Sequence, residues 1–259
     1  MPDQDLDFTG RTVLVTGSGR NIGRAIVLEF AARGANVIIN ARSNREEAEA
    51  VRQAAEALGA KALVVMGDAG DPATIAELKA RAEAAFGRVD IYVSNAARRM
   101  SKDFFETTDE EWHSHLNQQL SASWHLAKAF VPAMREAGYG RIIHMSGPDG
   151  SAGGWLRVPD ATAKGGLRAL TKSLAAGLGQ YGITVNEINP GIADTIRDPV
   201  THPTFSDPEH VRRLAAAIPI RRFTDPSEIA FACAFLCSPR ALPITGSMIH
   251  LDGGRDMRG

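Results

Sequence analysis

Apolar runs alternate with helical patterns along the whole chain. Seven runs predict strands, at residues 11–17, 36–40, 61–67, 89–95, 140–147, 183–191 and 247–254. Between them apolar residues recur every three or four positions, most clearly over 45–58 and 72–86, which predicts amphipathic helices. This alternation indicates βαβ units and a seven-stranded parallel sheet with helices on both faces. No change in composition divides the chain, so we expect one doubly wound α/β domain over residues 1–259.

The composition is that of an ordinary globular protein. The 259 residues are 44% hydrophobic and 23% charged, with a formal net charge of −1. That balance favours neither nucleic acid nor an anionic membrane as a partner. The chain lacks a long apolar stretch and a signal-like N-terminus, so we expect a cytoplasmic protein. Cys233 and Cys237 share one face of an apolar helical run, which predicts buried thiols rather than a disulfide.

Residues 191–209, GIADTIRDPVTHPTFSDPE, form the one loop-rich region. In a doubly wound fold, a long loop after a late strand lies over the carboxyl edge of the sheet. Two interpretations remain open for this segment. It is either a lid over a ligand site or an irregular connection.

Glycines cluster where the first predicted strand turns into a helix, in TGSGRNIGRAI. Gly17, Gly19 and Gly23 permit a tight turn and a close approach of backbone to ligand. The start of the helix offers free N–H groups and a positive dipole end to a pyrophosphate. The spacing departs from G-x-G-x-x-G, because Ile22 takes the sixth position. The order strand, glycine loop, helix, strand still predicts a dinucleotide site rather than a purely structural turn.

The residues after the second predicted strand distinguish NAD(H) from NADP(H). An acidic residue there would hold the ribose 2′-hydroxyl of NAD, but the sequence INARSN contains none. Arg42 stands there instead, and Arg20 lies inside the glycine loop. Two guanidinium groups can bind a 2′-phosphate bidentately, which favours NADP(H) over NAD(H). For each arginine, the alternative is a solvated surface charge.

Taken together, these motifs resemble the short-chain dehydrogenase/reductase (SDR) family, close to its 3-oxoacyl-acyl-carrier-protein reductases. The resemblance spans about residues 8–255. TGSGRNIG is similar to the family's T-G-x-x-x-G-I-G, with Asn21 at a glycine position. Asparagine tolerates a left-handed backbone better than most residues. SNAA (94–97) corresponds to N-N-A-G, and NPGIADT (189–195) contains P-G-x-x-x-T.

The resemblance implies a Rossmann fold, an oxidoreductase and a set of cofactor residues. This set comprises Gly17, Gly19, Arg20, Asn21, Ile22, Gly23, Arg42, Asp68, Ala69, Asn95, Ala96, Ala97, Lys164, Pro190, Gly191, Ile192 and Thr195. Within it, Asp68 would touch the adenine, Thr195 the nicotinamide carboxamide and Lys164 the nicotinamide ribose. The resemblance also implies a homotetramer in which helices at 110–137 and 160–180 pair between subunits. We assign no metal ligands.

The catalytic positions differ from the family pattern of Asn, Ser, Tyr and Lys. Alignment on the flanking motifs places Gln119 at the Asn position and Gly147, next to Ser146, at the Ser position. Asp160 falls at the Tyr position, and only Lys164 is retained. The spacing between Gly147 and Asp160 equals the family's usual separation, so the substitutions are not an artefact of register. Our candidate catalytic residues are Asp160, Lys164, Gln119 and Ser146.

An aspartate cannot simply replace the tyrosine as proton donor. The phenol of the family acquires a pKa that falls from ~10 toward neutrality beside the lysine. A carboxyl group with an ordinary pKa of ~4 is protonated only about once in ~10³ molecules at pH 7. This low availability corresponds to roughly 4 kcal/mol of lost catalysis.

Three hypotheses therefore remain. In the first, the chain is an NADP(H) oxidoreductase whose proton donor is Asp160 in an altered environment, Ser146 or one of His113, His115 and His144. In the second, Asp160 is a general base for elimination or isomerisation. In the third, the protein binds NADP(H) without catalysis, as a sensor or partner subunit. Asp160 could instead be a helix cap or a surface ion pair. We expect His144 to be packed on a face of its strand, and His113 and His115 to be solvated on a helix.

The substrate leaves fewer marks on the sequence. Arg98 and Arg99 follow the fourth predicted strand, at the carboxyl edge of the sheet, and could contact an anionic small molecule. Trp155 could form the wall of a pocket. The alternatives are exposed arginines and ordinary aromatic packing.

Overall fold

The computed structural model describes residues 4–197, 199 and 202–256. They form a seven-stranded sheet of β1 (Thr12–Val15), β2 (Asn36–Ala41), β3 (Ala62–Met66), β4 (Ile91–Ser94), β5 (Gly140–Met145), β6 (Ile183–Asn189) and β7 (Met248–His250). All neighbouring strands are parallel, in the order β3-β2-β1-β4-β5-β6-β7. The predicted doubly wound sheet is confirmed, with strand ends that differ from the predicted runs by a few residues.

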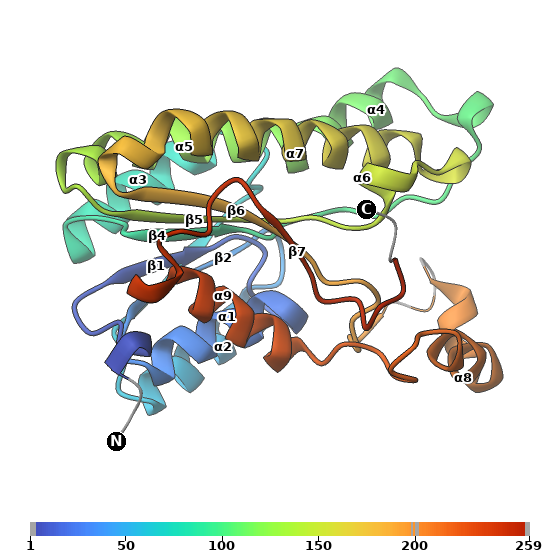
Figure 1. The fold of residues 1–259 in the computed structure, drawn as a ribbon, viewed down its shortest axis with the longest axis horizontal. Helices are drawn as coiled ribbons and strands as arrows, with labels where there is room; N and C mark the ends of the chain where they lie inside the picture. Colours follow the sequence, from blue (N-terminus) through green and yellow to red (C-terminus); the bar gives the residue numbers. More distant parts are fainter. Residues whose placement is uncertain (1–3, 198, 200–201, 257–259) are drawn as a thin grey trace.

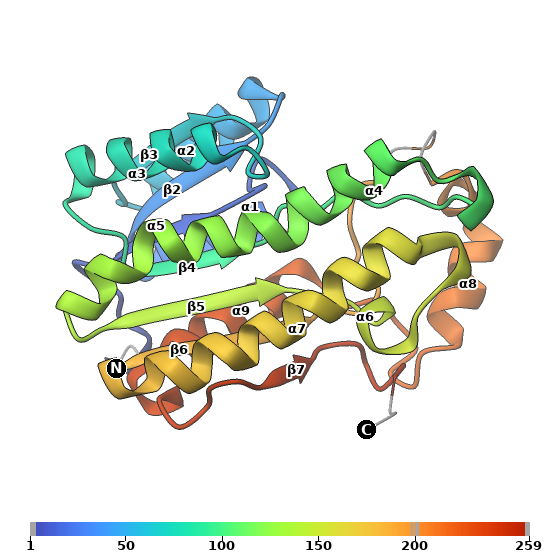
Figure 2. The same ribbon diagram turned by 90° about the horizontal axis from the view of Figure 1, so that it is seen from above.

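Helices cover both faces of the sheet (Figures 1 and 2). They are α1 (Asn21–Ala32), α2 (Arg45–Ala57), α3 (Pro72–Phe86), α4 (Asp109–Leu116), α5 (Ala122–Glu136), α6 (Asp149–Ala152), α7 (Val158–Leu178), α8 (Pro208–Ala216) and α9 (Pro226–Cys237). Helices α1, α2 and α9 lie on one face, and α3, α5 and α7 lie on the other. Among the described residues, no helix combines the length and the apolarity that crossing a membrane requires.

Local sequence signals explain where several helices begin. Asn44 and Asp71 cap α2 and α3 by accepting backbone N–H groups of the first turn. Thr108 forms a capping box with Glu111 at the start of α4, and Asp225 does the same for α9. The helix predicted over 110–137 is not uniform, because a wide π-type turn at Asn117–Ser121 separates α4 from α5.

Alternation along the strands builds two apolar layers. Val13 and Val15 of β1 pack into the layer beneath α1 and α9, while Leu14 enters the opposite layer with α3 and α5. Each fully buried side chain of this kind contributes about 1.5–3 kcal/mol. Cys233 and Cys237 are buried in the first layer as free thiols, as predicted.

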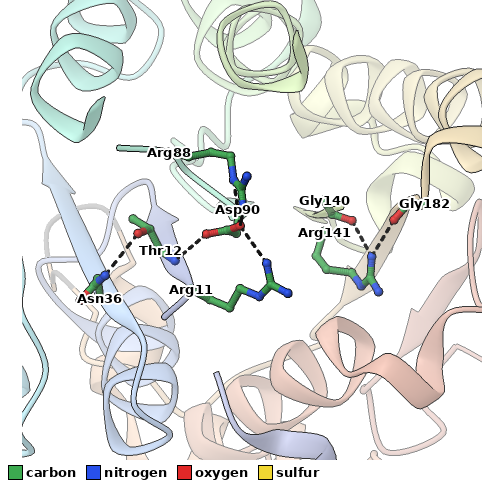
Figure 3. Close-up of polar contacts among 8 residues, drawn as sticks. All are labelled: Arg11, Thr12, Asn36, Arg88, Asp90, Gly140, Arg141 and Gly182. Carbon is green, nitrogen blue, oxygen red and sulfur yellow. Dashed lines mark hydrogen bonds and ion pairs between the residues drawn. The ribbon is translucent and has the colours of Figure 1, made fainter. Parts of the chain in front are cut away.

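Polar contacts connect the strands at the edge of the sheet where their N-terminal ends lie (Figure 3). The buried carboxylate of Asp90, directly before β4, accepts hydrogen bonds from Arg11 (3.2 Å), the backbone of Thr12 (3.0 Å) and Arg88 (2.7 Å). Nearby, the buried guanidinium of Arg141 donates to two backbone carbonyls at 2.8 and 3.0 Å. The Asp90 contacts join the starts of β1 and β4, and those of Arg141 join the starts of β5 and β6, at the edge opposite to the ligand site described below.

The loop-rich region at 191–209 lies partly outside the described residues. In its described part, Pro203–Ser206 form a short 3-10 turn, and α8 begins at Pro208 with Asp207 as its cap. The segment leads from the end of β6 to α8, so part of it lies at the carboxyl edge of the sheet, as expected for either interpretation.

Candidate active site

A cleft of about 1190 Å³ opens at the carboxyl edge of the sheet. Its wall includes the following predicted cofactor residues: Gly17, Gly19, Arg20, Asn21, Ile22, Gly23, Arg42, Asp68, Ala69, Asn95, Ala96, Ala97 and Thr195. Pro190, Gly191, Ile192 and Lys164 do not line it. The volume exceeds the ~300–1,000 Å³ of common small-ligand pockets, which leaves room for a dinucleotide and a small substrate together.

The glycine loop shapes one end of the cleft. Gly17 has φ +62°, and α1 begins at Asn21 with no side chain capping its first N–H groups. A Cβ on Gly23 would lie 2.5 Å from the carbonyl oxygen of Gly17, so only glycine permits this turn. Asn21 adopts the left-handed backbone, φ +52°, that asparagine tolerates. The loop therefore presents free N–H groups in a cradle that suits a pyrophosphate.

Asn21 also clasps the loop that follows β6. Its Nδ2 donates to the carbonyl oxygen of Ile196, and the Ile196 N–H donates back to Oδ1, both at 3.0 Å. A glycine at this position could make neither bond. The sequence analysis missed this contact, although an amide side chain at a glycine position was the signal for it.

Charged residues gather where the end of β2 meets the loop after β3. The carboxylate of Asp68 lies 3.8 Å from Nη1 of Arg42 and 3.6 Å from Nη2 of Arg98. Arg42 is half-exposed and Arg20 is exposed, so both guanidinium groups are available to a ligand. Ser43 also lines the cleft here, a residue that the sequence analysis did not select.

Asp160 lies in the first turn of α7 with 2% of its surface exposed. Its carboxylate accepts hydrogen bonds from Nε2 of Gln119 at 2.7 Å and from the backbone N–H of Met100 at 3.3 Å. Gln119 comes from the π-type turn between α4 and α5. Burial contradicts the alternative that Asp160 is a surface charge, and Asp160 does not cap α7. Because Met100 lines the cleft, Asp160 lies immediately behind its wall.

Lys164 lies one turn further along α7 and is 7% exposed. Burial lowers the pKa of its ammonium group, the charge of Arg99 lowers it further, and the charge of Asp160 opposes both. A Cβ on Gly147 would lie 2.6 Å from Nζ of Lys164. In this conformation, the end of the lysine side chain therefore occupies the space that a Cβ at position 147 would need.

Comparison with known proteins agrees with this geometry. Residues 17–256 match the family model described as enoyl-(acyl carrier protein) reductase. The chain belongs to the short-chain dehydrogenase/reductase family. It is thus an SDR-family oxidoreductase, and the predicted resemblance is confirmed.

Similar SDR proteins cover almost the whole chain. It is 38% identical over 252 residues to the 3-oxoacyl-acyl-carrier-protein reductase FabG of Escherichia coli (strain K12), covering 97% of this chain and 100% of FabG. It is 35% identical to the oxidoreductase UcpA of Escherichia coli O157:H7, covering 95% of each. The structure of L-sorbose reductase from Gluconobacter frateurii, complexed with NADPH and L-sorbose, has a TM-score of 0.92 and 30% identity, covering 99% of this chain and 100% of that chain.

Of the three histidines proposed as proton donors, His113 and His144 do not line the cleft, whereas His115 does. His144 is fully buried, its Nδ1 lies 2.8 Å from the hydroxyl of Thr171, and burial lowers its pKa to about 3. The ring is therefore neutral at pH 7 and has no acidic proton to supply. His113 is exposed, but His115 is buried, which contradicts its expected solvated position. The inner face of α4 carries His115, whose Nδ1 lies 2.9 Å from a backbone oxygen.

Glu187 of β6 is a buried acid that the sequence analysis missed. It is 1% exposed and lies opposite His144 in the β5–β6 register. Burial raises the pKa of its carboxyl group, while the hydroxyl of Ser146 and the charges of Arg168, His250 and Lys164 lower it. The Ser146 hydroxyl faces this carboxyl without full hydrogen-bond alignment and does not line the cleft. The sequence did carry a signal for this residue, namely an acidic residue inside an apolar run that predicts a buried strand.

Asn21→Gly tests the clasp. We expect the variant to release NADP(H) about tenfold faster in stopped-flow fluorescence, because two hydrogen bonds that hold the 196 loop are lost. Ile196→Ala is the matched control, since the clasp uses only the backbone of Ile196 and its side chain is 78% exposed. Equal release rates for Asn21→Gly and the wild type would show that the clasp does not retain the dinucleotide.

Glu187→Gln tests the buried acid through stability. A carboxyl group with a raised pKa contributes full stability below its ordinary pKa of 4.5 and loses it as pH rises through the folded value. Glu187→Gln has no carboxyl group to lose a proton at this position. Its free energy of unfolding should therefore rise relative to that of the wild type as pH increases from about 5 to 8. Urea unfolding across this range measures the difference, with Glu136→Gln on the exposed end of α5 as the control. A constant difference at all pH values contradicts the raised pKa.

Proposed function

We propose that this chain is an NADP(H)-dependent SDR oxidoreductase acting on a carbonyl, alcohol or conjugated small molecule through a non-standard site. The observation that carries the proposal is the buried ammonium of Lys164, which fills the space above Gly147 beside Asp160. In this proposal, Lys164 takes the proton-transfer role that a tyrosine has in the family.

The cleft supports the choice of NADP(H). Its glycine-lined end fits a pyrophosphate, and Arg20 and Arg42 stand near its adenine end. Guanidinium groups bind a phosphate bidentately, and no acid replaces them to hold a ribose hydroxyl at the end of β2. The similar L-sorbose reductase was solved with NADPH. When bound, NADPH would supply a hydride to the substrate carbon.

The protein residues would then manage the proton. An ammonium group becomes a better general acid as its pKa falls toward the working pH, and burial and Arg99 both lower the pKa of Lys164. In reduction, Nζ of Lys164, which does not line the cleft in this structure, would have to reach the substrate oxygen; its N–H bond would break as the proton passes to that oxygen and the carbon accepts the hydride. The neutral amine then regains a proton from solvent, and oxidation runs the same steps in reverse.

In this proposal, Asp160 and Gln119 favour the protonated ammonium form of Lys164. The negative charge of Asp160 favours the ammonium form, which opposes the effect of burial. The hydrogen bonds from Gln119 and Met100 fix the orientation of the carboxylate.

We extend the proposal to assembly as a cytoplasmic homotetramer. The family expectation is that α5 and α7 pair between subunits. Trp124 on α5 is 50% exposed, a large aromatic surface that such a pairing would cover.

Fluorescence titration tests the cofactor. We expect NADPH to bind more tightly than NADH, and the Arg20→Ala, Arg42→Ala double variant to weaken NADPH about 10²-fold by removing charge-assisted contacts to the 2′-phosphate. NADH binding should change by no more than about twofold, because it lacks that phosphate. Arg81→Ala, on the exposed surface of α3, is the control. Failure to bind either dinucleotide overturns the proposal.

Substitutions at Gly147 test the lysine. Gly147→Ala should lower NADPH-dependent turnover at least tenfold, because its Cβ would displace Nζ of Lys164. Gly147→Ser should be equally impaired, although it restores the family's residue. Only the Asp160→Tyr, Gly147→Ser double variant should gain ordinary ketone reduction, measured as loss of NADPH absorbance. Improvement by Gly147→Ser alone contradicts the role of Lys164, and NADPH binding without any turnover would favour the non-redox hypotheses.

A further inference from the structure

Arg99 is a cation in the cleft without a partner among the described residues. Arg99 lines the cleft in the segment that follows β4. Its surface is exposed to solvent, although neighbouring protein surrounds its guanidinium group. Within the part of the chain that the structure describes, no hydrogen bond or ion pair engages its guanidinium group. The adjacent Arg98 differs, because it pairs with Asp68 and donates to Ser114 at 3.1 Å.

Further cations surround Arg99. The surrounding protein lowers the pKa of Arg99 although the surface of this residue is exposed, and the charge of Arg157 lowers the pKa further. Burial also lowers the pKa of Arg197, to about 10, with Arg99 as the next cause. Arg197 is fixed in place, since it donates to the carbonyl of Ala193 at 2.8 Å and stacks on Phe205 at 3.8 Å. With Lys164, these groups place repelling positive charges around one end of the cleft.

The nearby acids are already engaged or exposed. The carboxylate of Asp149 pairs with Arg157 at 3.3 Å, and that of Asp160 accepts from Gln119 and Met100. Asp194 acts on Arg197 from an exposed position. None of these acids contacts Arg99. Asp160 and Asp149 act on Arg99 only through their charge, and no described acid pairs with its guanidinium group, which is therefore open to an anion.

We propose that Arg99, with Arg197 also lining the cleft, binds the anionic head group of the substrate, a carboxylate or a phosphoryl group. This inference rests on the proposed function, because the head group would orient a neighbouring carbonyl or alcohol carbon toward Lys164. The planar guanidinium fork matches both kinds of oxyanion. The substrate class is therefore a keto acid, a hydroxy acid or a phosphorylated carbonyl compound.

The cofactor phosphates do not explain this cluster. The pyrophosphate cradle lies at the glycine loop, and Arg20 and Arg42 lie near the adenine end of the cleft. Arg99 instead acts electrostatically on Asp160 and Lys164, the pair proposed for proton transfer. A structural arginine of this protein has partners, as Arg88 has in Asp90. Arg99 has the position and the free hydrogen-bonding capacity of a substrate ligand.

Calorimetry on protein saturated with NADP⁺ tests the subsite with three probes that share one ring, namely benzoate, phenylphosphonate and benzamide. We expect one or both anions to bind and neutral benzamide not to bind. The anion that binds more tightly identifies the head group as carboxylate or phosphoryl. Arg99→Gln should weaken anion binding at least tenfold, because the charged fork is lost. Arg81→Gln on α3 is the matched control and should bind like the wild type.

Turnover gives a second readout. With benzoylformate as substrate, Arg99→Gln should raise KM at least tenfold, whereas the rate with its neutral methyl ester should change by less than about twofold. Arg99→Lys keeps the charge but lacks the planar guanidinium fork. Its KM for benzoylformate should lie between that of the wild type and that of Arg99→Gln. The affinity for NADP⁺ should stay unchanged in each variant, which also verifies folding.

Two results overturn the subsite, namely benzamide binding as tightly as the anions or undiminished anion binding by Arg99→Gln. Failure of NADP⁺ to bind would instead overturn the proposed function. The anion titrations are then repeated on the protein without dinucleotide. If Arg99→Gln weakens anion binding in the absence of dinucleotide, the subsite is still supported. If Arg99→Gln leaves that binding unchanged, the subsite is overturned as well.

Discussion

The reversal of strand order between β1 and β4 is the constraint on which this structure depends. Right-handed crossovers carry α1 and α2 to one face of the sheet and α3, α5 and α7 to the other (Figure 2). At the reversal, the loops after β1 and β4 diverge, and the cleft lies between them. The contacts of Asp90 and Arg141 fasten the opposite edge (Figure 3), so the ligand site is built on loops that a rigid sheet positions.

A steric exclusion connects the unusual residues of the site. A Cβ at position 147 would lie 2.6 Å from Nζ of Lys164, so a side chain there would require the end of the lysine side chain to move. Asp160 lies behind the cleft wall, one helix turn before Lys164. It accepts a hydrogen bond from Gln119, and its negative charge acts on the lysine. Gly147, Asp160, Gln119 and Lys164 thus lie in one neighbourhood, in which Gln119 contacts Asp160 and the charge of Asp160 acts on Lys164.

Positive charge is distributed unevenly along the cleft. Near the adenine end, Arg42 and Arg98 share the carboxylate of Asp68, so part of their charge is balanced. Near Lys164, Arg99 has no such partner within the described residues. Since the formal net charge of the whole chain is −1, this local excess comes from placement rather than from composition. The two ends of the cleft are therefore suited to different anions.

The sequence by itself determined the sheet, the glycine loop and the family, because periodicity and short motifs reflect contacts within one or two turns or strands. It also predicted that Asp160, Gly147 and Gln119 differ from the family pattern, with Lys164 retained. Tertiary structure decided what surrounds them. The bond between Gln119 and Asp160 joins residues 41 apart, and the clasp between Asn21 and Ile196 joins residues 175 apart. The burial of His115 and Glu187 likewise depends on which helix or strand covers them. No local pattern encodes such contacts, because they depend on how distant segments pack after the sheet has formed.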